Sequence, residues 1–357
     1  MIVCQHFGTC GGCTLQNLPP EEYRAQKRQS VITALEKVGL GDVPVAEQIA
    51  APLYSRRRAV FKIEKAKGAV QVGFHARASH DIVDMRECLV LTPALLNLTQ
   101  TLRAALTPIL HDGEKAEIHA TDSETGLDLA FRCESKLTPA LTAALARAFA
   151  GKGIARILFN DEILMEDAAP AITLAGAKVL LPPQAFLQAT AQGEAALQSH
   201  VLELTKGAKS IADLFAGLGT FTLALAKKAK VHAVEQDATL LAALAAAVRS
   251  ASNLKPVTTE RRDLFKQPLT ALELRAFDAV VLDPPRAGAQ AQTRILAASQ
   301  SARPSKIAYV SCDAGSFARD AALLVGAGFR PGTVTPIDQF LYSGHIELVA
   351  GFERSGR

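Results

Sequence analysis

The chain has 357 residues, of which 49% are hydrophobic and 21% are charged, and its formal net charge is +4. This length allows one to three domains with sizeable cores, and the composition excludes a disordered or fibrous protein. No apolar run is long enough to span a membrane, and the first residues lack the features of a signal peptide, so a cytoplasmic protein is expected. The mildly basic charge is compatible with a polyanionic partner but does not identify one.

Half of the six cysteines lie within ten positions at the N-terminus, as Cys4, Cys10 and Cys13. In a cytosolic chain such clustering indicates a metal or cluster site rather than disulfides. A four-thiolate site needs one more ligand, and Cys88 is the nearest candidate. The ligand type suits an iron–sulfur cubane and a structural zinc ion equally, and His6 would serve the zinc alternative.

The region from about 40 to 180 has the pattern of a mixed α+β domain. After a helix over 19–39, the expected elements are strands at 56–63 and 70–74, a helix at 92–110, strands at 115–121 and 127–133, a helix at 137–150 and a strand at 154–160. The basic run from Arg56 to Lys67 is the best local candidate for phosphate contact, although charged strand edges that prevent aggregation explain it equally well. Cys133 lies in an alternating apolar strand and is expected in the core.

The stretch Ile211–Phe221 indicates a ligand site, because an apolar strand runs into Ala-Gly-Leu-Gly and then into a helix. Gly217 and Gly219 would let the backbone turn sharply and come close to a ligand. The third glycine of the dinucleotide fingerprint is missing, which disfavours a nicotinamide cofactor. The sequence also has no Gly-x-x-x-x-Gly-Lys loop, which argues against a nucleotide triphosphatase.

Polar residues follow several strands of the same region. Glu235 ends the next strand, about twenty residues after the glycines, where an acidic side chain accepts from both hydroxyls of a ribose. Asp263 follows a third strand, and Asp283 opens an Asp-Pro-Pro-Arg run after a fourth. Gln188, at the end of a proline-rich linker, would reach the same crevice from a domain boundary near 180–190. Together these positions favour a nucleoside-type ligand.

Two further residues carry candidate chemistry. Cys312 ends a buried strand at 307–310 and precedes a helix, so we expect its thiol in the same crevice, with the helix N-terminus favouring the thiolate. A buried, inert cysteine is the alternative. Glu347 is a lone acid in an apolar terminal strand over 343–350. Because an unpaired buried carboxylate is costly, Glu347 is expected to have a partner or a task.

In combination, these motifs resemble one family, the S-adenosylmethionine-dependent RNA uracil-5-methyltransferases that carry an iron–sulfur cluster. The resemblance rests on Cys-x5-Cys-Gly-Gly-Cys with Cys88, Phe-Leu-Gln at 186–188, Asp-Leu-Phe-Ala-Gly-Leu-Gly-Thr-Phe at 213–221, Asp-Pro-Pro-Arg-Ala-Gly at 283–288, Ser-Cys-Asp at 311–313 and Gly-His-Ile-Glu at 344–347. It implies an α/β chain with a C-terminal Rossmann-like class I methyltransferase domain (183–357) and a mixed α+β central RNA-binding domain (40–182). A small N-terminal cluster region (1–90) would include the first strands of the central domain.

The resemblance also implies roles for individual residues. Cys4, Cys10, Cys13 and Cys88 would hold a [4Fe–4S] cluster. S-adenosylmethionine would be surrounded by Gln188, Phe215, Gly217, Thr220, Glu235, Asp263 and Asp283, with Thr220 standing where the family usually has Asn. Cys312 would add to carbon 6 of the uracil as the nucleophile, and Glu347 would remove the proton from carbon 5 as the base. Many members begin with a small RNA-binding β-barrel that this sequence lacks, so we expect a short form or a chain that starts downstream of a lost domain.

The expected function is therefore methylation of carbon 5 of a specific uridine, with 23S rRNA as the expected target and transfer RNA as the alternative. RNA is the expected partner of a monomeric protein that does not bind membranes. Two alternatives remain. Asp-Pro-Pro-Arg resembles the loop with which purine amino-group methyltransferases hold an exocyclic amine, but Arg286 replaces the aromatic residue and such an enzyme needs no thiol. The other is a non-catalytic, cluster-bearing RNA-binding protein or redox sensor with a vestigial methyltransferase domain.

Overall fold

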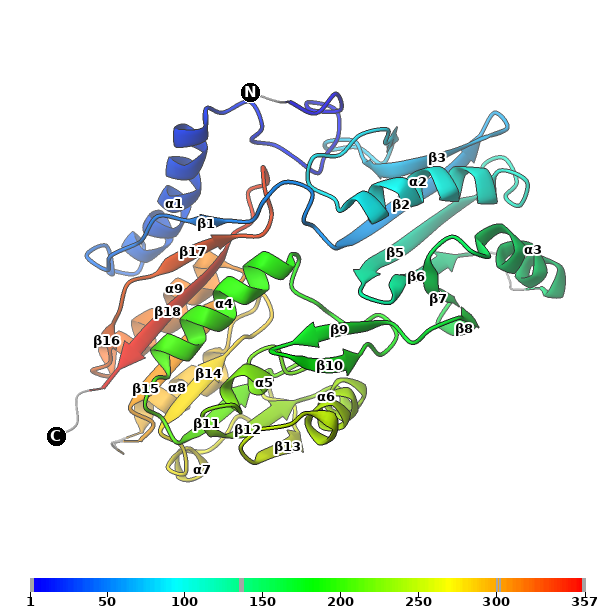
Figure 1. Cartoon of the computed structure of the whole chain (residues 1–357). Helices are drawn as coiled ribbons and strands as arrows, with labels where there is room; N and C mark the ends of the chain where they lie inside the picture. The colour runs from blue at the N-terminus through cyan, green and yellow to red at the C-terminus, as the bar shows by residue number, and fades with distance from the viewer. Residues whose placement is uncertain (1–2, 135–137, 300, 302, 355–357) are drawn as a thin grey trace.

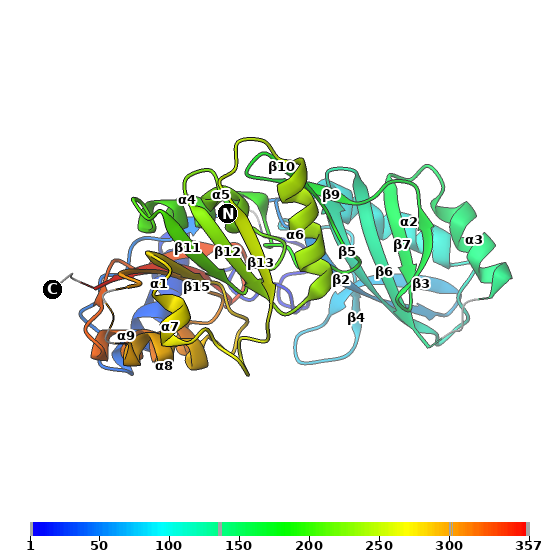
Figure 2. The ribbon, with the colours of Figure 1, turned by 90° about the horizontal axis from the view of Figure 1, so that it is seen from below.

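The structure is a computed structural model that describes residues 3–134, 138–299, 301 and 303–354. Two sheets organise these residues, one of nine strands and one of seven, and they form separate bodies that lie side by side (Figure 1, Figure 2). A two-stranded hairpin of β9 (Ala171–Leu174) and β10 (Ala177–Leu180) lies between the two bodies and packs on α6 (Ala238–Ser250). The α/β fold expected from the sequence is confirmed.

The larger sheet has the strand order β1-β17-β18-β15-β14-β11-β12-β13, with β16 paired to β18. Its strands are β1 (Ile49–Ala50), β11 (Ser210–Leu214), β12 (Lys230–Glu235), β13 (Val257–Arg261), β14 (Ala279–Leu282), β15 (Lys306–Ser311), β16 (Arg330–Pro331), β17 (Thr335–Asp338) and β18 (Glu347–Glu353). Five neighbouring strands of this sheet, β15, β14, β11, β12 and β13, are parallel, whereas β18 runs antiparallel to both β15 and β17. The strand order reverses between β11 and β14, and such a switch point opens a crevice at the carboxyl ends of the strands.

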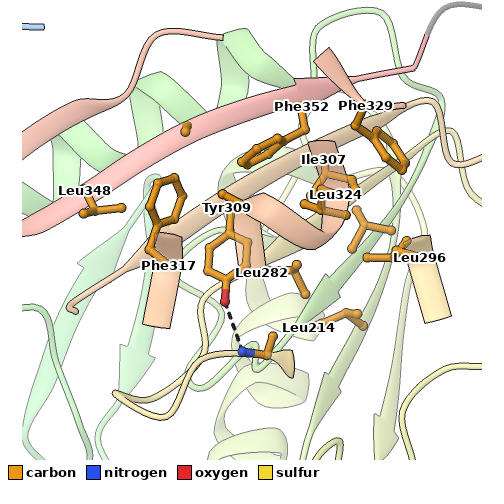
Figure 3. Close-up of a cluster of buried hydrophobic side chains, with 14 of the residues drawn as sticks. Leu214, Leu282, Leu296, Ile307, Tyr309, Phe317, Leu324, Phe329, Leu348 and Phe352 are labelled. Carbon is orange, nitrogen blue, oxygen red and sulfur yellow. Dashed lines mark hydrogen bonds between the residues drawn. The ribbon is translucent and has the colours of Figure 1, made fainter. Parts of the chain in front are cut away.

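Helices cover both faces of this sheet, as an open parallel sheet requires. They are α1 (Pro20–Glu36), α4 (Ala191–Leu204), α5 (Thr222–Leu225), α6, α7 (Ala271–Leu274), α8 (Gln290–Ala298) and α9 (Ala314–Gly326). On one face Leu282, Tyr309 and Phe317 belong to a continuous apolar core between the sheet and α8 and α9 (Figure 3). A second core on the other face lies under α4.

The smaller sheet has the order β4-β3-β2-β5-β6-β7-β8. Its strands are β2 (Arg58–Ala66), β3 (Ala69–His75), β4 (Ile82–Asp84), β5 (Lys115–Ser123), β6 (Gly126–Cys133), β7 (Ile154–Phe159) and β8 (Glu162–Glu166). Two helices, α2 (Pro93–Leu106) and α3 (Pro139–Phe149), cover one face, toward which Phe61 and Ile118 point. Alternate residues such as Arg58 and His119 therefore lie on the opposite face of the sheet.

The N-terminal segment contacts both bodies. Its cysteine run lies against the smaller sheet, where the Gly11 amide donates to the His75 carbonyl at 2.9 Å. The next helix, α1, instead packs on α9 and contributes Val31 and Leu35 to the core of the larger sheet. Strand β1 then extends that sheet by pairing in parallel with β17. Residues 20–50 are thus part of the body that carries the crevice, an arrangement that the order of motifs along the chain does not indicate.

Candidate active site

The turn after β11 is built on backbone conformations that side chains rarely adopt. Phe215 has a φ of 63°, Gly217 of 53° and Gly219 of 89°. A Cβ at Gly219 would also lie 2.4 Å from Cδ1 of Leu244 on α6, so a glycine is needed there for both space and φ. Thr220 is half-buried in the same turn, and its carbonyl accepts from the Gln198 amide at 3.0 Å. The turn is thereby fixed at the edge of the sheet.

Glu235 is held against this turn. One carboxylate oxygen accepts from the Gly217 amide at 3.0 Å, and the other accepts from the amides of Gln236 and Asp237 at 2.7 and 3.0 Å. Parallel pairing of β11 with β12 causes this proximity, because both strands end at the same edge. The acid at Glu235 therefore lies beside the glycine turn, in a position suited to ribose hydroxyls.

The loop after β13 approaches the same turn. Asp263 accepts from the Phe265 amide at 3.0 Å, which folds the loop back, and the rings of Phe265 and Phe215 lie 5.4 Å apart. An apolar surface therefore lies beside a carboxylate at this end of the crevice. Such a pair suits a flat heterocycle with hydrogen-bond donors.

Gln188 and Asp283 meet across the crevice, with the Gln188 Nε2 donating to Asp283 at 3.5 Å. The orientation of the Gln188 amide follows from a relay that begins at a backbone group. The amide of Thr190 donates to Oε1 of Gln339 at 3.1 Å, so Nε2 of Gln339 faces Gln188 and donates to its Oε1 at 2.9 Å. Because a backbone N–H only donates, this chain leaves the Gln188 NH2 pointing into the crevice.

Asp213 is a buried acid that is not among the site residues predicted from the sequence. It lies fully buried in β11, where Oδ2 accepts from the Thr222 hydroxyl and Oδ1 has no hydrogen-bond partner among the described residues. Burial raises the pKa of Asp213 to about 7. The signal was present in the sequence, because Asp213, like Glu347, is a lone acid in an apolar strand.

Cys312 and Glu347 are brought together by the antiparallel pairing of β15 and β18. Ser311 pairs with Leu348, so Cys312 directly after one strand lies opposite Glu347 at the start of the other. Glu347 is only 4% exposed, and Cys312 is half-buried. Asp313 caps α9 by accepting from the Ser316 amide at 2.7 Å, which fixes the backbone on the other side of Cys312. The thiol and the carboxylate therefore lie near one another at the carboxyl end of β15, where the charges of Glu347 and Asp283 both reach Cys312.

The electrostatics of this cluster favour protonated acids. Burial raises the pKa of Glu347 to about 7, against the opposing effect of Arg286 and Arg58. Burial, together with the charges of Glu347 and Asp213, raises the pKa of Asp283 well above its usual range. Three acidic groups in a low-dielectric site cannot all ionise without a cation close by.

The Cys312 thiol is also held in its protonated form. Burial and the charges of Glu347 and Asp283 raise the pKa of Cys312 to about 11, whereas Arg286 acts in the opposite direction. The expectation that the start of α9 favours the thiolate is therefore wrong for this structure. Desolvation and two neighbouring carboxylates outweigh the helix dipole, whose effect amounts to about 1 kcal/mol.

A buried network fixes the loop that follows Asp283. Asp320 on α9 is fully buried and accepts from the Ala289 amide at 2.8 Å and from the Tyr309 hydroxyl at 2.6 Å. The Ala289 amide also donates to that hydroxyl at 3.0 Å, which is the contact drawn in Figure 3. Arg319 binds both Asp320 and the Ala287 carbonyl. The helix that follows Cys312 thus holds the loop that carries Arg286.

The open face of the smaller sheet adjoins this edge. A hollow there is lined by Arg56, Arg58, His119, Thr121, Asp128 and Gln184. The Arg58 guanidinium lies 4.2 Å from the ring centre of Phe186, which is 62% exposed, and the charge of Arg58 also reaches Glu347. A basic surface with an exposed aromatic ring therefore borders the carboxylate.

The four N-terminal candidate ligands gather in one place. Cys4, Cys10, Cys13 and Cys88 line a single cavity. Burial raises the pKa of Cys13, and the charges of the other three cysteines raise it further. No group of three or more His, Cys, Asp and Glu side chains in the described part of the chain is arranged to hold a metal ion. Neither the zinc nor the cluster alternative is confirmed, although the donor set matches the thiolates that iron–sulfur clusters use.

Comparison with known proteins adds to this geometry. The model of the tRNA (uracil-5-)-methyltransferase family matches residues 173–354. The chain is also 44% identical over 357 residues to an uncharacterised RNA methyltransferase of Rhizobium meliloti (strain 1021), covering 98% of this chain and 85% of that protein. The chain belongs to the tRNA (uracil-5-)-methyltransferase family. The expectation of an S-adenosylmethionine-dependent RNA uracil-5-methyltransferase is thereby confirmed.

Two further proteins are similar to this chain, one in sequence and one in fold. It is 32% identical over 370 residues to the 23S rRNA (uracil(1939)-C(5))-methyltransferase RlmD of Bordetella parapertussis, covering 98% of this chain and 79% of that protein. Its fold is similar to that of the Pyrococcus abyssi tRNA (uracil-54, C5)-methyltransferase solved in complex with S-adenosyl-L-homocysteine. The TM-score is 0.75 at 22% identity, over 96% of this chain and 84% of that one. The part of the chain that the structure describes has no helix long and apolar enough to cross a membrane.

Proposed function

We propose that this enzyme methylates carbon 5 of one uridine in 23S rRNA through a covalent bond between Cys312 and carbon 6 of the base. The observation that carries the proposal is the register of β15 and β18, which sets Cys312 opposite Glu347 at the crevice. The relative named as a 23S rRNA methyltransferase supports the choice of ribosomal RNA. Transfer RNA is the second candidate, since the family model is described as a transfer RNA methyltransferase.

The proposed chemistry requires both residues, because carbon 5 of uracil is a weak nucleophile. S-adenosylmethionine supplies a methyl group on a positively charged sulfur. The Cys312 thiol would lose its proton to solvent and its sulfur would bond to carbon 6, so that the displaced electron pair forms an enolate. Carbon 5 of the enolate would take the methyl group, with S-adenosyl-L-homocysteine as the leaving group. The Glu347 carboxylate then accepts the carbon-5 proton, the C5–C6 double bond re-forms, and the C6–S bond breaks to release the thiolate.

The environment of Glu347 suits this role as a base. A pKa of about 7 leaves part of the population ionised at neutral pH while keeping the carboxylate basic enough to accept a proton. The side chains of Glu235, Asp263 and Gln188 would hold the cofactor, with the Gln188 NH2 as a donor and the two acids as acceptors. The strained turn around Gly217 would let the backbone approach it.

RNA would approach over the open face of the smaller sheet. A base inside a stack cannot reach a half-buried thiol, so the target uridine would have to leave its stack. The hollow lined by Arg56 and Arg58 offers positive charge for phosphates, and Phe186 offers an exposed ring for a neighbouring base. These residues lie on the side of the crevice from which Arg58 acts on Glu347.

The four N-terminal cysteines would hold a [4Fe–4S] cluster. Support comes from their convergence on one cavity, from the four-thiolate donor set, and from the apolar lining that Phe74, Val83 and Met85 contribute. Iron and acid-labile sulfide in protein purified without oxygen would test this, with Cys10→Ser as the variant and Cys133→Ser as the control. Iron retained in the first variant at the wild-type level would contradict the assignment.

The reaction is tested by methyl transfer from labelled S-adenosylmethionine into total RNA, followed by separation of ribosomal and transfer RNA and nucleoside analysis. We expect label in 5-methyluridine of ribosomal RNA, its loss in Cys312→Ala, and its retention in Cys133→Ala. Label in a methylated purine that persists in Cys312→Ala would establish an amino-group methyltransferase instead. RNA binding without transfer of label would favour a non-catalytic protein.

A further inference from the structure

Lys27 of α1 is a buried cation that the residues of the proposed reaction do not explain. It is 3% exposed, and its ammonium group lies 2.5 Å from Oδ1 of Asp338, 3.1 Å from the Phe340 carbonyl and 2.7 Å from the His345 carbonyl. An ammonium group has three N–H donors, so every donor has a partner. Asp338 ends β17, and Phe340 and His345 belong to the segment that joins it to β18. We call this segment, residues 339–346, the base loop.

The two carbonyls lie near the two ends of the base loop. The loop therefore folds around the ammonium group, and its second contact lies two residues before Glu347. Without Lys27, two carbonyls and the fully buried Asp338 carboxylate would lose a charged donor. Buried polar groups that lack hydrogen-bond partners destabilise the fold, so the loop would move until these groups found new partners.

Neighbouring N-terminal residues hold the middle of the same loop. Tyr23, one helical turn before Lys27, accepts from the Tyr342 amide at 2.9 Å and donates to Asp338. The amides of Thr14 and Leu15 donate to the Tyr342 carbonyl at 2.7 and 2.9 Å. Tyr342 itself has a φ of 60°, a conformation that a bulky residue keeps only when its surroundings enforce it. The N-terminal segment thus fixes the base loop at its middle as well as at its ends.

We propose that Lys27 is a positioning residue for the base Glu347, and that its effect falls on the removal of the carbon-5 proton. This inference rests on the proposed function, in which Cys312 attack and methyl transfer precede that step. Those earlier steps use Cys312 and the cofactor-binding residues, and Lys27 contacts none of them among the described residues. The loop residue that orients Gln188 is Gln339, and it is held by the Thr190 amide and not by Lys27. Loss of Lys27 should therefore let the methylated covalent complex form but slow its resolution.

The test compares Lys27→Met with Arg28→Met, the neighbouring residue of the same helix. The Arg28 guanidinium donates to the Val45 carbonyl at 2.9 and 2.6 Å and has no hydrogen bond to the base loop among the described residues, so its loss perturbs α1 elsewhere. Glu347→Gln provides the reference for a missing base. For each full-length protein we would measure turnover, RNA affinity by filter binding, and the amount of denaturant-resistant protein–RNA complex that carries the labelled methyl group.

We expect Lys27→Met to lower turnover about 100-fold, since a displacement of about 1 Å of a catalytic group has an effect of that size. The labelled covalent complex should accumulate as in Glu347→Gln, and RNA affinity should stay within about twofold of wild type. Arg28→Met should keep wild-type turnover without accumulating complex. Lys27→Gln, which keeps a polar group but not the three donors, serves if the methionine variant does not fold.

Two results would overturn the inference. If turnover, covalent complex and RNA affinity all fall together in the folded Lys27 variant, Lys27 has only a structural role. If turnover does not change, the base loop keeps its position without Lys27. Absence of the methylated complex in Glu347→Gln would be a different failure, because it would remove Glu347 as the base and the inference with it.

Discussion

Replacing Glu347 by Gln should stabilise the protein at the pH at which the enzyme works. Burial moves the pKa of Glu347 from its usual 4.5 to about 7, and the side chain is 4% exposed, so solvent screens this effect little. Between about pH 4.5 and 7 the folded protein keeps a proton on Glu347 that the unfolded chain has lost. The free energy of unfolding therefore falls as the pH rises through this window, and the loss is complete above pH 7.

The size of the effect follows from the shift. One pKa unit corresponds to about 1.4 kcal/mol, so a rise from 4.5 to about 7 destabilises the folded state by about 3 kcal/mol above pH 7. Glutamine has nearly the same shape and no charge to desolvate, so the variant should recover most of this energy. It should also relieve Asp283, whose pKa the Glu347 charge raises. The gain should vanish below about pH 4.5, where the wild-type carboxyl becomes protonated in both states.

The assay is urea unfolding followed by circular dichroism at several values from pH 4.5 to 8. The matched control is Glu353→Gln, at the exposed end of the same strand. We expect a difference between variant and wild type that grows by about 1.4 kcal/mol per pH unit between pH 4.5 and 7, and no such trend in the control. A variant less stable than wild type at pH 8, or an equal difference at both ends of the range, would refute the electrostatic reasoning.

Three more outcomes are expected from the same structure. The positive sulfonium of S-adenosylmethionine should lower the pKa of Cys312 from about 11. Alkylation of Cys312, followed by peptide mapping, should therefore be faster at pH 8 with S-adenosylmethionine than with S-adenosyl-L-homocysteine, whose sulfur is uncharged. Equal alkylation rates would contradict this effect of the sulfonium charge. Gly219→Ala should weaken S-adenosylmethionine binding at least tenfold in calorimetry, because the added Cβ would lie 2.4 Å from Leu244 and the backbone φ at this position is 89°. Unchanged affinity would show that the turn can accommodate the added methyl group. Asp320→Asn should lower the free energy of unfolding by about 2 kcal/mol, because an amide replaces a fully buried carboxylate that accepts hydrogen bonds from three groups. An unchanged midpoint of urea unfolding would show that Asp320 does not stabilise the fold in this way.

The sequence predicted those features that depend on local pattern. The strand, glycine turn and acid at Ile211–Glu235 were readable because parallel strands place their carboxyl ends at one edge. The helix expected at 92–110 lies at Pro93–Leu106, since its apolar period and its Thr92 cap are both local signals. By contrast, the hairpin of β9 and β10 was not anticipated, because its two four-residue strands carry too little periodicity to stand out.

Properties that depend on contacts distant in sequence could not be read in the same way. A helix start beside Cys312 predicted a thiolate, but the sequence does not show that two carboxylates and a protein interior lie around the sulfur. The position of α1 was equally hidden, because the cysteine run before it lies on one body and the helix on the other. Asp213 differs from these cases, because a lone acid in an apolar strand is a local feature that the sequence does show.

The pairing of β18 shows how strongly the site depends on one such distant contact. Because the side-chain period of a strand is two, a shift of the register by one residue would turn Glu347 to the opposite face of the sheet and away from the crevice. The apolar residues that follow Glu347 lie against both cores and set this register, with Leu348 in one core and Val349 in the other. The base loop then decides where the strand begins, and α1 holds that loop at Asp338, Phe340 and His345. Packing of an N-terminal helix and alternation in a C-terminal strand thus jointly place one carboxylate beside one thiol, which explains why residues more than 300 positions apart must fold as one unit.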